Sequence, residues 1–286
     1  MIIGYQGIPG CYSESALDTM VKLENDYQKK NFNSFEKVFK AVIKQEINLA
    51  FLPIENNLGG SIYLNYDLLV KYGLNIIGEY NFLVNHYLIC HPDSDISKIK
   101  KVISHPQALS QCDQYISNND FEREDFYDTS GAVKHILDND LMDVAAIASI
   151  NSAKLYNAKV LVSEIQDCEL NYTRFFLLSQ DIYQDHLKLE NNKISIYFIL
   201  KNSTGSLVDS LQVLSKYNID LTKIECRPYP WKNKIINKND IFNPFRYIFY
   251  IDMKKTTNDQ NIYLAFEELK QKTIEFEILG HYPSIF

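Results

Sequence analysis

The chain opens with the stretch Ile2-Ile3-Gly4-Tyr5-Gln6-Gly7-Ile8-Pro9-Gly10-Cys11-Tyr12-Ser13-Glu14, residues 2–14. Its apolar start, Ile2–Tyr5, predicts a buried strand. A loop rich in glycine and proline follows, and Ser13 and Glu14 then stand where a helix would begin. Because a strand that passes through a short loop into a helix is the unit of α/β folds, this stretch predicts parallel sheets flanked by helices.

The same alternation continues along the first part of the chain. The predicted strands are Leu49–Pro53, Leu74–Gly78, Leu83–Cys90, Lys101–Ser104, Val144–Ala148, Lys159–Val162 and Arg174–Ser179, and amphipathic stretches predict helices at Ser13–Lys22 and Phe35–Lys44. We expect Leu83–Cys90 to cross into a second lobe, about residues 83–162, and the chain to return near Val162–Asp167. Two lobes joined by two crossings form a cleft, which is a common ligand site.

The pattern changes after the polar segment Asp181–Asn192, which we expect to be a linker. Strands are predicted at Ile194–Leu200, Asn218–Arg227, Arg246–Met253 and Thr273–His281, with helices at Gly205–Tyr217 and Asp259–Lys272. This βαββαβ order predicts a ferredoxin-like module. We therefore expect two domains, residues 1–181 and 193–286. The Lys- and Asn-rich segment Trp231–Pro244 is expected to be an exposed loop.

Composition excludes several classes of protein. The 286 residues carry a net charge of −7 without a long Lys/Arg run, so no nucleic-acid partner is expected. No apolar run approaches the ~20 residues of a membrane span, so no membrane partner is expected either. The five cysteines show no metal-binding spacing and are interpreted as reduced thiols. We expect a cytoplasmic protein.

Four junctions carry small polar residues at places where helices could start. They are Gly10–Glu14, Asn56–Ser61, Ser104–Gln107 and Asp128–Gly131. Helix N-termini bind anions because their N–H groups are free and the helix dipole is positive there. The four junctions favour a small substrate with more than one carboxylate, although such residues also serve as ordinary helix caps.

No established catalytic motif is present. The sequence has no GxSxG elbow, P-loop or HExxH, and its six histidines show no ligand spacing. His105, just before a predicted helix, could line a site or be structural. From the residues alone we predict an α/β domain with a cleft for a small anion, followed by a ferredoxin-like module, and the reaction stays open.

At the same junctions the sequence resembles the prephenate dehydratase family. Gly4–Glu14 is similar to the family's GxxGxYSE block, Pro53–Ser61 to PIENSLGGS, and Asn171–Phe175 to NxTRF. Ser104–Leu109, Asp128–Ala132 and Ala145–Ser149 match further blocks of the family. Gly205–Val208 resembles GALV, Glu225–Pro228 resembles ESRP, and Leu279–Pro283 resembles LGSYP. These blocks occur in the family's order and cover nearly the whole chain.

The resemblance implies a two-lobed catalytic domain like a periplasmic binding protein, followed by an ACT-type regulatory domain. It implies conversion of prephenate to phenylpyruvate in L-phenylalanine biosynthesis, with no metal or redox cofactor, regulation by L-phenylalanine, and a homodimer or homotetramer. Two alternatives remain open, namely an arogenate dehydratase and a non-catalytic amino-acid sensor. Asn57 stands where the family has Ser, and we expect this departure to change substrate contacts.

The resemblance also assigns site residues. It places the catalytic hydroxyl on Thr173, which we interpret as a hydrogen-bond donor to the departing oxygen. The expected substrate-binding residues are Ser13, Asn56, Gly60, Ser61, Gln107, Thr129, Ser130, Gly131, Arg174 and Phe175. The expected effector-binding residues are Asn202, Gly205, Leu207, Val208, Glu225, Arg227 and Pro228.

Overall fold

The computed structural model describes residues 1–21, 27–181, 190–229, 246–255 and 259–285. Its contacts divide the chain into two units, which are described separately. Unit 1 comprises Met1–Asn65 and Tyr80–Phe176, and unit 2 comprises Tyr66–Glu79 and Leu177–Phe286. Trp231–Pro244 and most of the predicted linker Asp181–Asn192 lie outside the described residues.

The first sheet has the strand order β16-β5-β11-β3-β1-β2, with β4 paired to β3. Its strands are β1 (Ile2–Gln6), β2 (Gln28–Phe32), β3 (Leu49–Asn56), β4 (Gly60–Ser61), β5 (Asn75–Leu83), β11 (Tyr172–Ser179) and β16 (Ser284–Ile285). The accompanying helices are α1 (Tyr12–Val21), α2 (Phe35–Ile43) and α3 (Tyr63–Tyr72). Strand β1 pairs in parallel with both β2 and β3, since α1 and α2 provide the crossovers. Strands β5 and β11 each contribute to both units.

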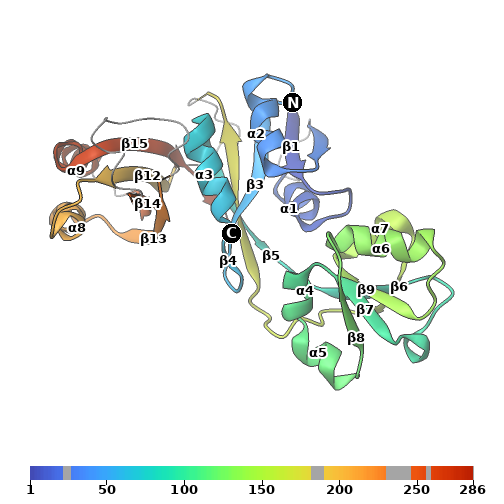
Figure 1. Cartoon of the computed structure of the whole chain (residues 1–286). Coiled ribbons are helices and arrows are strands. Elements are labelled where there is room, and N and C mark those ends of the chain that lie inside the picture. Colours follow the sequence, from blue (N-terminus) through green and yellow to red (C-terminus); the bar gives the residue numbers. More distant parts are fainter. Residues whose placement is uncertain (22–26, 182–189, 230–245, 256–258, 286) are drawn as a thin grey trace. The chain divides into compact units, whose positions relative to one another are not determined.

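The second sheet, in unit 1, has the order β10-β6-β9-β7-β8. Its elements are β6 (Tyr87–Cys90), a 3-10 turn (Ile96–Lys98), β7 (Lys101–Ser104), α4 (Pro106–Ser110), α5 (Asp113–Asn118), β8 (Glu122–Asp125), α6 (Thr129–Asp138), β9 (Val144–Ala148), α7 (Ile150–Tyr156) and β10 (Lys159–Val162). Strand β9 is buried on both faces: Ala145 and Ile147 pack with residues of α4 and α5, while Ala146 and Ala148 pack with residues of α6 and α7. Figure 1 shows these helices around the sheet.

Unit 2 confirms the predicted βαββαβ pattern. Its elements follow in the order β12 (Lys193–Leu200), α8 (Ser206–Lys216), β13 (Leu221–Pro228), β14 (Tyr247–Lys254), α9 (Asp259–Lys272) and β15 (Thr273–Tyr282). The antiparallel sheet has the order β13-β14-β12-β15. Ile194, Ile196 and Phe198 alternate along β12 and pack in one core with side chains of α8 and α9. The two helices therefore cover one face of this sheet (Figure 1).

Residues of α3 contact strands β13 and β14 within unit 2. The Arg227 guanidinium lies 2.9 Å from the Asp67 carboxylate, and the rings of Tyr66 and Tyr250 lie 4.9 Å apart. The Tyr250 hydroxyl also donates to the Tyr66 carbonyl at 3.1 Å. These contacts explain why residues 66–79 group with the C-terminal part of the chain, although they fall inside the span predicted for the catalytic domain.

Three sequence expectations differ from the structure. Strands β2 and β8 were not predicted because they are edge strands with almost fully exposed side chains, so they show no apolar pattern. Leu83–Cys90 is not one strand, because β5 ends at Leu83 and β6 begins at Tyr87. The helix start predicted at Asn56–Ser61 is wrong. This segment is the turn of the β3–β4 hairpin, in which Gly60 has a φ of 82° and lies opposite Asn56.

A buried ion pair in unit 2 gives a stability prediction. Lys193 Nζ lies 2.7 and 2.8 Å from the two carboxylate oxygens of Glu79, whose side chain is only 1% exposed. Lys193→Met should destabilise the protein by about 3–5 kcal/mol in urea denaturation, because it leaves a buried carboxylate without its cation. Adding Glu79→Gln should recover most of the loss.

The exposed pair of Lys254 and Asp220 is the matched control, with side chains 66% and 61% exposed. Lys254→Met should cost much less, because water solvates the remaining carboxylate. Equal effects of the two lysine substitutions would contradict the prediction.

Candidate active site

Unit 1 contains a cavity of about 220 Å³. Residues of both lobes line it, together with the returning strand β11. The lining residues are Tyr12, Ser13, Phe35, Pro53, Asn56, Ile62, Val84, His86, His105, Gln107, Ala108, Gln111, Thr129, Thr173 and Phe175. The cavity therefore combines an apolar wall with hydroxyl, amide and imidazole groups, which is typical of a site that orients a small polar ligand.

Six of the predicted site residues meet at this cavity: Ser13, Asn56, Gln107, Thr129, Thr173 and Phe175. Ser13 and Thr129 lie in the first turns of α1 and α6, where the helix dipole favours an anion. Gln107 lies in the first turn of α4, which the His105 side chain caps by accepting from the Gln107 N–H. The first turns of α1, α4 and α6 therefore line the same cavity, as expected for three of the four junctions.

The Thr173 hydroxyl is held by the side chain of Asn56. Asn56 Nδ2 lies 3.0 Å from Thr173 Oγ1 and 2.8 Å from Asn171 Oδ1. Asn56 Oδ1 accepts from the N–H groups of Leu58 and Gly59 at 3.1 and 2.7 Å. Because the Thr173 oxygen accepts a bond from Asn56, its own proton can be donated to a group inside the cavity.

Five other predicted residues do not line the cavity. Arg174 alternates with Thr173 and Phe175 along β11, and its guanidinium lies 3.2 Å from the Glu55 carboxylate. The Ser130 hydroxyl donates to the Pro9 carbonyl at 2.7 Å. Gly131, Gly60 and Ser61 are likewise absent from the lining, so substrate contact for these five residues stays a prediction.

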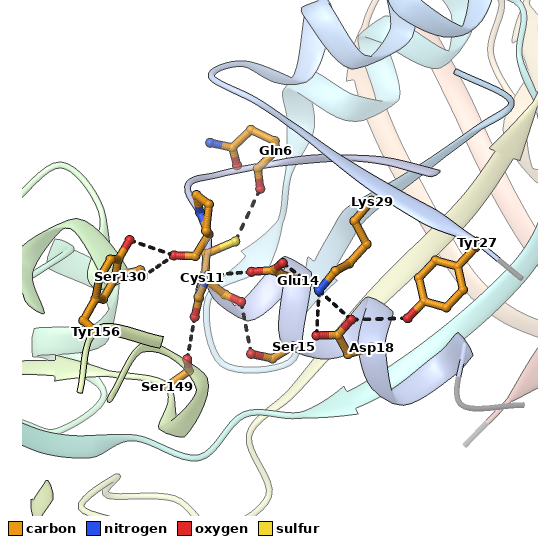
Figure 2. Close-up of polar contacts among 12 residues, drawn as sticks. Gln6, Cys11, Glu14, Ser15, Asp18, Tyr27, Lys29, Ser130, Ser149 and Tyr156 are labelled. Carbon is orange, nitrogen blue, oxygen red and sulfur yellow. Dashed lines mark hydrogen bonds and ion pairs between the residues drawn. The ribbon is translucent and has the colours of Figure 1, made fainter. Parts of the chain in front are cut away.

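The loop before α1 is fixed by a polar network (Figure 2). Figure 2 shows Ser130, Ser149 and Tyr156 pointing at the backbone beside Cys11, where Pro9 and Gly10 supply the carbonyl acceptors. Burial raises the pKa of the Cys11 thiol to about 12, so Cys11 is a poor candidate for a nucleophile. These contacts join the first lobe to α6 and α7 and position the start of α1.

A carboxylate on α1 holds the same loop from the other side. Glu14 Oε2 accepts from the Gly10 N–H at 2.5 Å, and Glu14 Oε1 lies 2.7 Å from Lys29 Nζ (Figure 2). Burial acts to raise the pKa of Glu14, but the bonds to Lys29 and Gly10 lower it overall. Glu14 is therefore charged at neutral pH, and its role in this structure is to fix the loop.

Sequence reasoning did not assign a role to Tyr12, His86 or Gln111, which also line the cavity. His86 lies in the short connection between β5 and β6, and Gln111 is the C-cap of α4. Burial lowers the pKa of His86 and raises that of Tyr12, so both are neutral at neutral pH. The only sequence signal for these three residues was the Gly4–Glu14 block, which contains Tyr12. No signal pointed to His86 or Gln111.

A second cavity, of about 160 Å³, lies in unit 2. Asn202 and Leu207, two of the expected effector residues, line it, and so does Arg246. Gly205 has a φ of 86°, and a Cβ built on it would meet nothing nearer than the Asp209 carboxylate at 3.8 Å.

The other expected effector residues do not line this second cavity. They are Gly205, Val208, Glu225, Arg227 and Pro228. Val208 is 57% exposed, and Glu225 and Arg227 form ion pairs with Lys223 and Asp67. Contact with an effector stays a prediction for these five residues, as it does for Asn202 and Leu207.

Neither a metal site nor a membrane span is found in the part of the chain that the structure describes. There, no three His, Cys, Asp or Glu side chains form a group that could hold a metal ion. No helix among the same residues is long and apolar enough to cross a membrane.

The two lobes and their cavity define a two-lobed α/β protein whose cavity suits a small polar ligand, and comparison with known proteins gives the family. The sequence model of the prephenate dehydratase family matches residues 3–182. Arogenate dehydratase 2 of Petunia hybrida is 37% identical over 285 residues, which cover 99% of this chain and 71% of that protein. This chain belongs to the prephenate dehydratase family, whose members are lyases.

Two solved structures share the fold. GqqA, described as a novel type of quorum quenching acylase, has a TM-score of 0.85 and 25% identity, covering 100% of this chain and 98% of its own. The prephenate dehydratase of Arthrobacter aurescens in complex with L-Phe has a TM-score of 0.85 and 22% identity, covering 99% and 89%. The predicted two-lobed α/β fold is confirmed.

The geometry of Thr173 gives a prediction for catalysis. Thr173→Ala should lower kcat by about 10²-fold or more, because it removes the hydroxyl that Asn56 orients toward the cavity. Thr173→Ser should keep more activity. Steady-state kinetics with prephenate measures both, with circular dichroism as the control for folding. A near-normal kcat for the alanine variant would remove Thr173 from the reaction.

Proposed function

We propose that this protein is a prephenate dehydratase, which converts prephenate to phenylpyruvate, carbon dioxide and water. The observation that carries the proposal is the Thr173 hydroxyl, held by Asn56 in a cavity lined by the first turns of α1, α4 and α6. Prephenate loses its ring carboxylate and its ring hydroxyl, so the site must bind anionic groups and assist a leaving oxygen. The described lining supplies groups for both tasks.

In the proposed reaction the bond between the ring and its carboxylate breaks, and its electron pair enters the ring. The ring becomes aromatic as the C–O bond to the hydroxyl breaks. Thr173 donates a hydrogen bond to the departing oxygen, and a proton from solvent completes the water. General-acid help of this kind contributes about 10²–10⁴-fold. Ser13, Gln107 and Thr129 orient the carboxylates.

The lining of the cavity favours prephenate over arogenate. Arogenate carries an ammonium group where prephenate carries a keto oxygen, and a buried ammonium is usually paired with a carboxylate. No Asp or Glu is among the described residues that line the cavity. The Petunia relative, in contrast, is named an arogenate dehydratase.

Competition between the two substrates tests this choice. We expect kcat/KM to be at least about tenfold higher for prephenate than for arogenate, a difference of about 1.4 kcal/mol in transition-state binding. Phenylpyruvate and phenylalanine formation are followed in one mixture by chromatography. Preferential turnover of arogenate would reverse the assignment, and turnover of neither substrate would refute the proposed reaction.

We also propose that L-phenylalanine regulates the enzyme through the ferredoxin-like module, acting as an ACT-type domain. The second cavity supports this, because Arg246 offers a cation for a carboxylate and Leu207 an apolar contact for a ring. The module would pair with another copy, in a homodimer or homotetramer, since β13 and β15 are the edges of its sheet. A cytoplasmic location is part of the proposal and agrees with five free cysteines.

Leu207 and Leu211 provide a matched pair for testing the effector site. Both lie on α8 and pack against the same core, but only Leu207 lines the second cavity. Leu207→Ala should weaken phenylalanine binding about tenfold or more, as expected for the loss of a buried leucine contact. Leu211→Ala should leave the affinity unchanged. Calorimetric titration measures both, and equal affinities in the two variants would place the effector elsewhere.

A further inference from the structure

A chain of side-chain hydrogen bonds runs from Tyr12 to Thr173 along the wall of the cavity. The Tyr12 hydroxyl lies 2.6 Å from His86 Nδ1, and His86 Nε2 lies 2.8 Å from Gln111 Oε1. Gln111 Nε2 lies 3.3 Å from Asn56 Oδ1, and Asn56 Nδ2 lies 3.0 Å from Thr173 Oγ1. These five side chains come from five segments that are far apart in the sequence, and the fold alone brings them together.

Backbone N–H groups fix the orientation of the Asn56 amide. Asn56 Oδ1 faces the N–H groups of Leu58 and Gly59, which can only donate. The Asn56 amide therefore cannot be flipped, because flipping would set its NH₂ against these two donors. Its Nδ2 then faces Thr173 Oγ1 together with Asn171 Oδ1 and the Tyr172 carbonyl, and its Oδ1 accepts from Gln111 Nε2.

The same argument assigns the proton of His86. Since Gln111 Nε2 points to Asn56, Gln111 Oε1 points to His86 Nε2 and also accepts from Asn171 Nδ2 at 3.0 Å. An oxygen acceptor requires a donor, so His86 Nε2 carries the proton. His86 Nδ1 is then an acceptor and binds the Tyr12 O–H. Burial lowers the pKa of His86, which keeps the ring neutral.

We propose that this directed chain holds Thr173 as a hydrogen-bond donor, and that His86, in its neutral Nε2-protonated form, is a positioning residue for the dehydration. This inference rests on the proposed function. Every link donates toward Thr173, so the Thr173 oxygen receives a hydrogen bond and its own proton is not used by any link of the chain. Hydrogen bonds in such a series polarise one another and strengthen the final donor.

The chain orients Thr173 and does not carry protons to it. Gln111 and Asn56 are amides, and a proton passing through an amide would require an unfavourable imidic acid form. The expected effect of breaking a link is therefore the loss of an oriented hydrogen bond, which is smaller than the loss of the Thr173 hydroxyl. Such a loss lowers kcat and kcat/KM together and leaves KM nearly unchanged.

Two amide substitutions of His86 separate positioning from general damage. In His86→Gln the amide NH₂ can replace the Nε2 donor toward Gln111, whereas the shorter side chain in His86→Asn replaces only the Nδ1 position. We expect kcat with prephenate to fall about five- to tenfold in His86→Asn and clearly less in His86→Gln, with KM changed little in both. Equal losses in the two variants, or no loss in either, would overturn the proposal.

Tyr12→Phe tests the outer end of the chain and has a matched control in Tyr156→Phe. The Tyr12 hydroxyl contacts His86 Nδ1 and, at 3.2 Å, the Asn85 carbonyl. The Tyr156 hydroxyl donates to the Pro9 carbonyl, also at 3.2 Å, and Tyr156 does not line the cavity. Tyr12→Phe should lower kcat about two- to fivefold, and Tyr156→Phe should lower it clearly less. A loss of the same size in both variants would contradict a specific role for Tyr12.

Nitrogen NMR of the histidine-labelled wild-type protein tests the tautomer without any activity measurement. The His86 resonances, assigned by their disappearance in His86→Gln, should show a protonated Nε2 and a bare Nδ1 at neutral pH. A protonated Nδ1 or an imidazolium would refute the directed chain. If the wild-type protein does not convert prephenate, the proposed function fails, while the tautomer result still decides whether the chain exists.

Discussion

The orientation of one buried amide, that of Asn56, determines how the rest of the site is arranged. The Asn56 side chain is 5% exposed and has bonds to the β3–β4 turn, to β11 and to Gln111 in the second lobe. Leaving a buried polar group without a hydrogen-bond partner lowers the free energy of unfolding by about 1–3 kcal/mol. The bonds of the Asn56 amide therefore stabilise the positions of these segments relative to one another. The turn, the returning strand and the end of α4 therefore take up their positions jointly, and the Thr173 hydroxyl is oriented as a consequence.

The sequence predicted the parts of the site whose residue types indicate a function by themselves. The junctions that contain Ser13, Gln107 and Thr129 were recognisable because small polar residues near helix starts satisfy free N–H groups and favour anions, and the family resemblance then assigned the three residues. His86 and Gln111 could not be recognised in this way. A lone histidine in a short connection and a glutamine at the end of a five-residue helix have no diagnostic spacing. Their part in the site depends on long-range contacts, which only the folded structure reveals.

The fold was predictable where side chains are buried, and less so where they are not. The buried strands β1, β3, β7 and β9 read as apolar runs, whereas the edge strands β2 and β8 place charged and polar residues on both faces. The Asn56–Ser61 turn was mistaken for a helix start because asparagine and glycine suit both structures. In the protein the Asn56 side chain caps its own turn, and the helix begins only at Tyr63.

Asn57 shows how a departure from the family pattern can act on the backbone instead of the substrate. We expected this residue to change substrate contacts, yet it does not line the cavity. Its Oδ1 accepts from the Tyr172 N–H and its Nδ2 donates to the Leu170 carbonyl, each at 2.7 Å. A serine hydroxyl is shorter and has its donor and acceptor on one atom, so it could not span both groups in this way. The asparagine therefore pairs with the segment just before Thr173 much as a neighbouring strand would. The departure supports the same hydroxyl that Asn56 orients, because Asn56 and Asn57 are neighbours at the start of the turn and both bond to residues 170–173.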